Sequence, residues 1–265
     1  MSLPSSAEWT YTNLHPSGAQ HSYVEDLSGG RQIGYATINY YARASIWTGT
    51  AESRVDLQPA GATESRAYDI ANGVQVGMAR FGSYYHAGLW TGSAASWVDL
   101  NPAGATQSYA WDVSGDQQVG HAQFNGVWHA GVWNGTAERW NDLHPDGTAS
   151  SYLLGISGQW QSGDVRVGSW DHASIWNGTA DSWEDLHTLL PARFSHSYAN
   201  AIEVSGNDIW VGGYAWDLSI DRREAVLWHT VIPEPSSFLA LGTGLGTLAG
   251  VFGRKTRRHR DRRTP

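Results

Sequence analysis

Histidines and aspartates recur at a fixed interval along this chain, and both residue types can bind metals or transfer protons. The histidines stand four residues before a tryptophan and the aspartates directly before a leucine: His86, His129 and His172; Asp56, Asp99, Asp142 and Asp185. A metal ion needs its ligands close together, whereas repeat units hold equivalent residues apart. We therefore expect each histidine to make a hydrogen bond at a strand edge and each aspartate to accept backbone N–H groups in a turn.

Paired carboxylates also serve glycoside hydrolysis, which needs two acids about 5–10 Å apart, one of them with a raised pKa. An aspartate in nearly every repeat favours a structural role, because catalysis breaks the symmetry of a repeat. The chain has no Cys, so neither a disulfide nor a cysteine-based metal or redox site can form. It has no Gly-x-Ser-x-Gly, phosphate-loop or His-Glu-x-x-His motif. We predict no enzyme, catalytic residue, metal or cofactor; a polysaccharide hydrolase or lyase is an alternative.

Tryptophan is abundant, with 15 copies among 265 residues, and it is suited to bind sugars. An indole face stacks on the CH groups of a sugar ring while nearby acids meet its hydroxyls. Five tryptophans recur in register and are predicted to fill the interior, whereas others are placed irregularly. Among the irregular ones, the candidate ligand-binding residues are Trp111, Trp128 and Trp170.

A repeat of 43 residues must position these side chains. Leucines mark it at positions 14, 57, 100, 143 and 186. Tryptophans keep the same interval at Trp47, Trp90, Trp133 and Trp176, and Trp228 follows after 52 residues. Serines and glycines hold the same register: Ser22, Ser65, Ser108 and Ser151; Gly34, Gly77, Gly120 and Gly163. Such self-similarity indicates a fold built from copies of one unit.

One unit, residues 94–133, contains four short runs separated by turn residues. The runs are Ser96–Leu100, Ser108–Val113, Gln118–Phe124 and Val127–Trp133. The second run alternates small or acidic residues with large ones, which is a strand pattern. Asn125-Gly126, between the last two runs, favours a tight hairpin turn. No window before the C-terminal tail has apolar residues at helical spacing.

Four strands in a unit of this length are typical of one blade of a β-propeller. We therefore predict an all-β fold in which residues 1–229 form a five-bladed propeller. Small Ser/Ala faces would allow close packing between sheets, and tryptophans would fill the wider gaps. The chain starts with the first run of a unit and ends with the last, so Ala225–Trp228 is expected to complete the blade begun at residues 8–14. Six or seven blades would need repeats beyond this sequence.

Residues 230–265 form a second region with a different composition. Pro233-Glu234-Pro235 precedes an apolar run from Phe238 to Phe252, and a basic cluster follows from Arg254. The apolar run is shorter than the ~20 residues of a usual spanning helix. The basic flank is expected to stay cytoplasmic. We predict a short transmembrane helix that holds the repeats outside the membrane.

This tail closely resembles the PEP-CTERM sorting signal of Gram-negative bacteria. The resemblance implies that an exosortase, a membrane cysteine protease-transpeptidase, recognises Pro233, Glu234 and Pro235. It implies a basic stop at Arg254, Lys255, Arg257 and Arg258. It also implies a transient inner-membrane anchor, followed by transfer to the cell surface or extracellular matrix, commonly in bacteria that make exopolysaccharide. Proteins with such a tail carry a signal peptide, whereas residues 1–6 have no basic or apolar signal region.

The repeats resemble the HAF-type extracellular repeats of bacteria over roughly residues 8–228, best at 87–120 and 130–143. This resemblance implies a propeller-like β fold in an exported protein and no known activity. Charge agrees with a molecule in two parts: residues 254–263 carry seven basic residues and one acid, and the rest carries ten basic and 24 acidic residues. An acidic body argues against nucleic acid as a partner.

We therefore expect a non-enzymatic surface or matrix protein of the kind found in biofilms. Its partners would be the exosortase and, transiently, the inner membrane. The alternative is a lectin-like propeller that binds extracellular polysaccharide.

Overall fold

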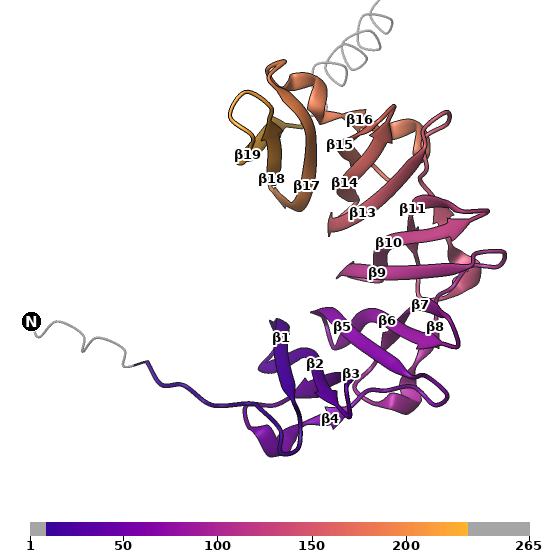
Figure 1. Ribbon diagram of the computed structural model, residues 1–265, viewed down its shortest axis with the longest axis vertical. Helices are drawn as coiled ribbons and strands as arrows, with labels where there is room; N and C mark the ends of the chain where they lie inside the picture. The colour runs from indigo at the N-terminus through magenta and orange to yellow at the C-terminus, as the bar shows by residue number, and fades with distance from the viewer. Residues whose placement is uncertain (1–8, 233–265) are drawn as a thin grey trace, which may run out of the picture.

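The computed structural model describes residues 9–232, which form an all-β chain of consecutive antiparallel sheets. The first four sheets have four strands each, and the fifth has three. Figure 1 shows the sheets side by side along an arc, with β1 near one end and β19 near the other. Within these residues no helix has the length and apolar character that crossing a membrane requires.

Each sheet is a run of consecutive strands. Sheets one and two contain β1 (His21–Ser28), β2 (Arg31–Ile38), β3 (Tyr41–Trp47) and β4 (Val55–Asp56), then β5 (Glu64–Ala71), β6 (Val74–Phe81), β7 (Tyr84–Trp90) and β8 (Val98–Asp99). Sheets three and four contain β9 (Gln107–Ser114), β10 (Gln117–Phe124), β11 (Val127–Trp133) and β12 (Asn141–Asp142), then β13 (Ser150–Ser157), β14 (Trp160–Val167), β15 (Trp170–Trp176) and β16 (Glu184–Asp185). Sheet five contains β17 (Phe194–Ser205), β18 (Asp208–Asp217) and β19 (Arg222–Val231).

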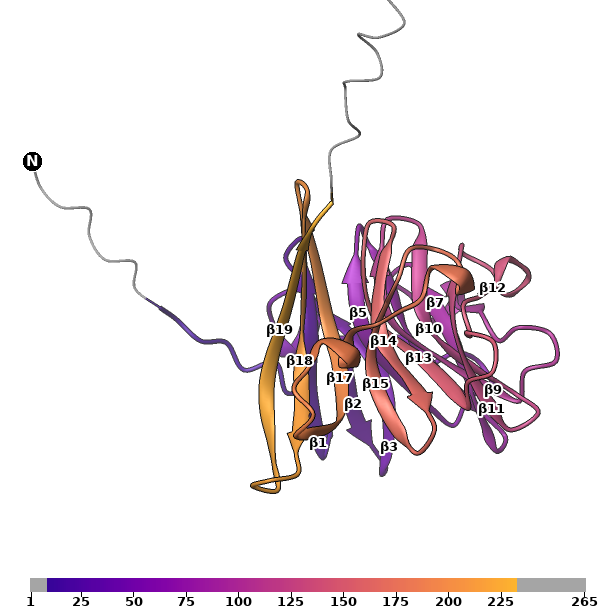
Figure 2. The ribbon, with the colours of Figure 1, turned by 90° about the horizontal axis from the view of Figure 1, so that it is seen from above.

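Short 3₁₀ turns precede the fourth strands, and one more lies before sheet five: Ala51–Ser53, Ala94–Ser96, Ala137–Arg139, Ala180–Ser182 and Leu186–Leu189. In the four-stranded sheets the first strand lies on the concave side of the arc and the fourth strand on the outer side (Figure 1). Figure 2 shows the sheets from above, stacked one after another. This radial order of strands resembles that of propeller blades.

The strand prediction is confirmed for three of the four runs in a unit, which form β9, β10 and β11. Asn125-Gly126 makes the tight turn between β10 and β11 with positive φ at both residues. The first run differs from the prediction. Ala94–Ser96 is a 3₁₀ turn, and Val98–Asp99 pairs with β7, the strand before it. A sheet therefore begins one run later than predicted, because this short strand returns to its nearest neighbour.

The predicted packing between sheets is confirmed. The side chains of Trp47, Trp90, Trp133 and Trp176 are completely buried. Trp176 packs with Leu153 of its own sheet and with Val132 and Leu143 of the preceding sheet. From Ser65 onward the repeat serines are also buried, and each accepts a hydrogen bond across a sheet boundary, as Ser65 does from the backbone N–H of Ala44 at 3.0 Å.

The structure does not show the predicted closure of five blades into a ring. Ala225–Trp228 is part of β19, which pairs with β18, and residues 9–20 contain no strand. The fifth sheet therefore lacks the outer strand that the other four possess. The predicted sorting motif, transmembrane helix and basic stop lie outside the described residues.

Candidate ligand-binding site

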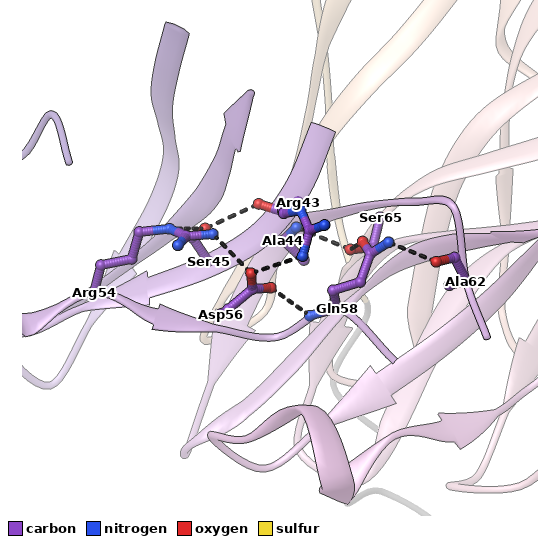
Figure 3. Close-up of polar contacts among 8 residues, drawn as sticks. All are labelled: Arg43, Ala44, Ser45, Arg54, Asp56, Gln58, Ala62 and Ser65. Atoms are coloured by element: carbon purple, nitrogen blue, oxygen red, sulfur yellow. Dashed lines mark hydrogen bonds and ion pairs between the residues drawn. The ribbon is translucent and has the colours of Figure 1, made fainter. Parts of the chain in front are cut away.

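The recurring histidines and aspartates form hydrogen-bonded pairs at the outer part of the sheets. Nδ1 of the histidine lies 2.7 Å from the carboxylate in the pairs His86–Asp99 and His129–Asp142, and 2.8 Å in His172–Asp185. The first sheet has Arg43 in the place of the histidine, 3.2 Å from Asp56 (Figure 3). The other carboxylate oxygen of Asp56 accepts the backbone N–H of Gln58 at 2.9 Å. These residues thus hold strands and turns together, as the sequence predicts.

The candidate residues Trp111 and Trp128 lie in one aromatic cluster. Both rings contact the ring of His121, at centroid distances of 6.1 and 4.9 Å. Tyr109 and Tyr152 complete the cluster, at 5.4 and 4.9 Å from His121. Burial lowers the pKa of His121 to about 3, so its imidazole is neutral. Its Nδ1 has no hydrogen-bond partner in the described structure.

The candidate Trp170 belongs to a second cluster, in sheets four and five. Its ring is stacked on His196 with centroids 5.3 Å apart, and Trp216 stacks near the same imidazole at 5.6 Å. Trp170 is 49% exposed, so its indole is accessible to a ligand. The structure therefore does not unite the three predicted tryptophans in one site.

Tyrosines recur at one strand position along the arc. The residue after each repeat serine is aromatic in four of the five sheets: Tyr23, Tyr109, Tyr152 and Tyr198. Tyr198 is stacked on Tyr214 with ring centroids 4.8 Å apart. The equivalent Tyr23 is stacked on Tyr35 at 4.9 Å. Because the same strand positions carry these rings in successive sheets, the aromatic surface follows the arc.

Two acids interrupt this aromatic pattern in sheet four. Asp164 on β14 stands opposite Tyr152, where the other sheets carry Tyr35, Met78, His121 or Tyr214. Asp171 on β15 stands opposite Arg166. The Arg166 guanidinium binds both oxygens of Asp171, at 2.9 and 3.0 Å, and the Tyr198 hydroxyl donates to the same carboxylate at 2.8 Å. The pattern of the repeat is therefore broken at one place on the molecule.

These acids and tyrosines meet in an open pocket of about 370 Å³ between sheets four and five. Its lining contains Tyr152, Leu154, Asp164, Arg166, Asp171, Tyr198, Asn200 and Tyr214. Pockets that bind small molecules usually measure about 300–1,000 Å³. The pocket is therefore large enough for one small ring with its substituents.

The two carboxyls have opposite electrostatic environments. Asp164 is 6% exposed, and no hydrogen bond from residues 9–232 contributes to the pKa of its carboxyl. Burial, with a further contribution from the charge of Asp171, raises the pKa of Asp164 to about 7. Burial alone would also raise the pKa of Asp171, but hydrogen bonds from Arg166 and Tyr198 lower it overall. Near neutral pH the pocket therefore presents an ionised carboxylate beside a carboxyl that can donate or accept a hydrogen bond.

The pocket joins apolar ring faces to polar groups that can meet hydroxyls. Asp164, Asp171 and the tyrosines around them are not among the site residues predicted from the sequence. Two features of the sequence could have indicated this pocket. One is the tyrosine that follows the repeat serine, and the other is the aspartate at position 164, where the other repeats carry Tyr, Met or His. The burial of Asp164 could not be read from either. Comparison with models of protein families, with curated proteins and with solved structures found no match.

Proposed function

We propose that this chain is an exported glycan-binding protein that holds an extracellular polysaccharide at the pocket between sheets four and five. The observation that carries the proposal is the meeting of Tyr198 and Tyr214 with the unpartnered Asp164 in one open pocket. Aromatic faces and carboxyls are the two groups that a sugar ring needs, for its CH groups and its hydroxyls. The aromatic surface that follows the arc supports a ligand longer than one sugar.

The charge of the chain favours a neutral polysaccharide. Outside the basic segment 254–263, acids outnumber basic residues by 24 to 10. Like charges repel an anionic polymer before it reaches the pocket. Neutral glucans are therefore the first ligands to test.

The C-terminal tail supports delivery to the outside of the cell. Pro233-Glu234-Pro235, the apolar run and the basic cluster stand in the order of an exosortase sorting signal. In this proposal an exosortase processes the tail after a transient stay in the inner membrane, and the repeats remain at the surface or in the matrix. The stack of β-sheets is the part that acts there.

Hydrolysis of the polysaccharide is the second candidate, because Asp164 and Asp171 have the separated pKa values of an acid and a base. They are diagonal neighbours on adjacent strands, which places such residues roughly 7–8 Å apart. Arg166 and Tyr198, however, engage both oxygens of Asp171. A carboxylate held in this way is a poor base or nucleophile, so binding without cleavage is the better proposal.

Affinity electrophoresis of the full chain tests the proposal. In native gels that contain hydroxyethyl cellulose, dextran or laminarin, we expect at least one neutral polymer to retard the protein. Asp164→Asn and Tyr214→Ala should each reduce the retardation at least tenfold, because the first replaces the carboxyl that meets the sugar hydroxyls by an amide and the second removes a stacking face. Trp210→Ala is the matched control, since Trp210 is an exposed aromatic residue outside the pocket lining and is stacked on His229.

Retardation that persists unchanged in Asp164→Asn and Tyr214→Ala would place the ligand elsewhere, and no retardation by any neutral polymer would contradict the proposal. Release of reducing ends from the retarding polymer, lost in Asp164→Asn, would replace it by the hydrolase.

A further inference from the structure

The two ends of the sheet stack expose residues whose equivalents are buried or partly buried at the boundaries between sheets. At each boundary, the third strand of the earlier sheet contributes one buried apolar residue. These four residues are at most 8% exposed: Ile46, Leu89, Val132 and Ile175. The equivalent residue of the last sheet is Leu227, which is 63% exposed. On the later sheet, Ile70, Val113 and Ile156 are at most 6% exposed, whereas their equivalent Leu27 in the first sheet is 68% exposed.

The last sheet also has a partly formed site for a fourth strand. Beside β19 lies a pocket of about 550 Å³, lined in part by Leu186, Ile209, Leu227 and Trp228. The outer edge of β19 pairs with no strand among the described residues. In the other sheets this edge is covered by the short strand before the repeat leucine, such as Val55–Asp56 on β3.

The segment before β1 already has the shape of the connection that follows such a fourth strand. Figure 3 shows this connection after β4, where Gln58 binds Asp56, Ala62 and Ser65. His15 makes the same three contacts: its N–H donates to Asn13 at 2.9 Å, its Nε2 to the Ala19 carbonyl at 3.1 Å, and its Nδ1 lies 2.9 Å from the Ser22 hydroxyl. Residues 12–14 therefore lead into β1 as residues 55–57 lead into β5.

One contact of this connection is unfilled. The oxygen of each later repeat serine accepts a backbone N–H from the preceding sheet, at 2.9–3.0 Å from Ala44, Ala87, Ala130 or Ala173. Ser22 accepts no such hydrogen bond within residues 9–232. The residue of the last sheet at the matching position is Ala225.

We propose that residues 12–14 of one copy of this chain add to β19 of a second copy, so that the copies assemble head to tail. The register follows from the other sheets, in which Val55 pairs with Ile46 and Val98 with Leu89. Thr12 then pairs with Leu227 and Asn13 with Val226. The same step stacks Leu27 and Val24 of one copy on the last sheet of the other. The new boundary repeats the four boundaries already present in the chain.

The geometry of the arc favours a second copy over the chain's own β19. Figure 1 shows the N-terminal segment leaving the first sheet at the end of the arc away from β19. To reach its own β19 the chain would have to change the packing at all four sheet boundaries, each built around fully buried side chains such as Trp90 and Trp133. Close-packed interiors resist such changes. A head-to-tail contact between copies leaves these boundaries intact and, when repeated, forms an open filament of copies.

Cysteine cross-linking of the full chain tests the proposal, because the natural sequence has no Cys. Thr12→Cys and Leu227→Cys are made as separate variants, purified in mild detergent, mixed and oxidised. Facing residues on paired strands have the Cα spacing that a disulfide needs. The mixture should therefore yield a disulfide-linked dimer of the two variants on a non-reducing gel. Such a dimer can form only between copies.

Two controls define the outcomes. Val226→Cys replaces Leu227→Cys in the first control, and its link to Thr12→Cys should be at least tenfold weaker because adjacent residues face opposite sides of a strand. Each single variant oxidised alone measures random collision. The proposal is overturned if the mixture gives no more dimer than the single variants alone. It is also overturned if a disulfide forms only within one chain, in a double variant that carries both Thr12→Cys and Leu227→Cys, because that link would show a ring within one chain.

Mass measurement by analytical ultracentrifugation gives a second readout. Leu27→Arg places a charge on a residue exposed in the single copy, so the fold should persist while the assembly dissociates to single copies. Leu218→Arg is the control, since Leu218 is similarly exposed at 60% but lies outside the proposed contact. A single-copy mass for the unmodified chain at high concentration, or an assembly unchanged by Leu27→Arg, contradicts head-to-tail contact.

Discussion

Partly buried carboxyls link successive sheets on the concave side of the arc. Asp26, Asp69 and Asp112 each accept a backbone N–H from the next sheet, at 3.1, 2.8 and 2.8 Å. Asp69 stands in the middle of this series. Burial, together with hydrogen bonds to Asp112 and Asp26, raises the pKa of Asp69 to about 9. In the folded protein Asp69 therefore carries a proton at neutral pH, whereas in the unfolded chain it is ionised.

We predict that Asp69→Asn stabilises the protein at pH 8 and has little effect at pH 4. The folded pKa lies above the unfolded value, so the stability that the proton provides is complete below about pH 4 and is lost as the pH rises through 9. Asparagine keeps a neutral donor and acceptor at every pH. Thermal unfolding should show Tm gains at pH 8 of about 2–4 °C for each kcal/mol recovered.

The difference in Tm between variant and parent is the quantity to follow, because carboxyls outside the Asp26–Asp69–Asp112 series titrate equally in both. Asp116→Asn, in an exposed turn, should show no such pH-dependent difference. A gain for Asp69→Asn that is equal at pH 4 and pH 8 would mean that Asp69 is ionised in the fold.

At the scale of the elements, the recurring glycines follow from a bulge in the first strand of each sheet. A Cβ at Gly77, Gly120 or Gly163 would lie 1.9–2.0 Å from a carbonyl oxygen of the first strand, that of the residue directly before the one paired with the glycine. The register of the first two strands shifts beside each of these glycines. The bulged strand thus passes too close for any side chain at this position.

Adjacent glycines in β18 allow a matched test. A Cβ at Gly213 would lie 1.8 Å from the Tyr198 carbonyl oxygen, whereas a Cβ at Gly212 would have no atom within 4 Å. Gly213→Ala should lower the free energy of unfolding by roughly 1–3 kcal/mol, the usual cost of overpacking. Gly212→Ala should leave it within about 0.5 kcal/mol. Urea unfolding measures both, and equal effects of the two substitutions would contradict the bulge.

The sequence indicated the strands, their turns and the buried tryptophans, because these depend on local alternation and on a repeat visible along the chain. It misplaced the start of each sheet, since Val98–Asp99 belongs to the strand before it by a pairing that local sequence does not specify. Trp111 and Trp128 lie in one aromatic cluster and Trp170 in another, a separation that their places in the sequence do not reveal. Asp164 was missed because its burial depends on the neighbouring sheet, which no local pattern reports.

At the scale of the whole molecule, the boundaries between sheets follow the repeat, whereas the candidate pocket lies where the repeat is broken. The boundaries of the stack repeat the same apolar contacts, and its ends leave copies of those contacts exposed. The pocket with Asp164 and Asp171 lies where one sheet departs from the repeat. Stacking and ligand binding therefore use different residues, and a change in one should leave the other intact.

Hydrogen exchange of the full chain with and without hydroxyethyl cellulose tests the central claim, that the pocket between sheets four and five holds a glycan. We predict slower exchange at residues 164–171 and 194–200 when the polymer is present, and the same rates as before in Asp164→Asn. Slower exchange confined to the first two sheets, or unchanged rates at 164–171 and 194–200, would contradict it.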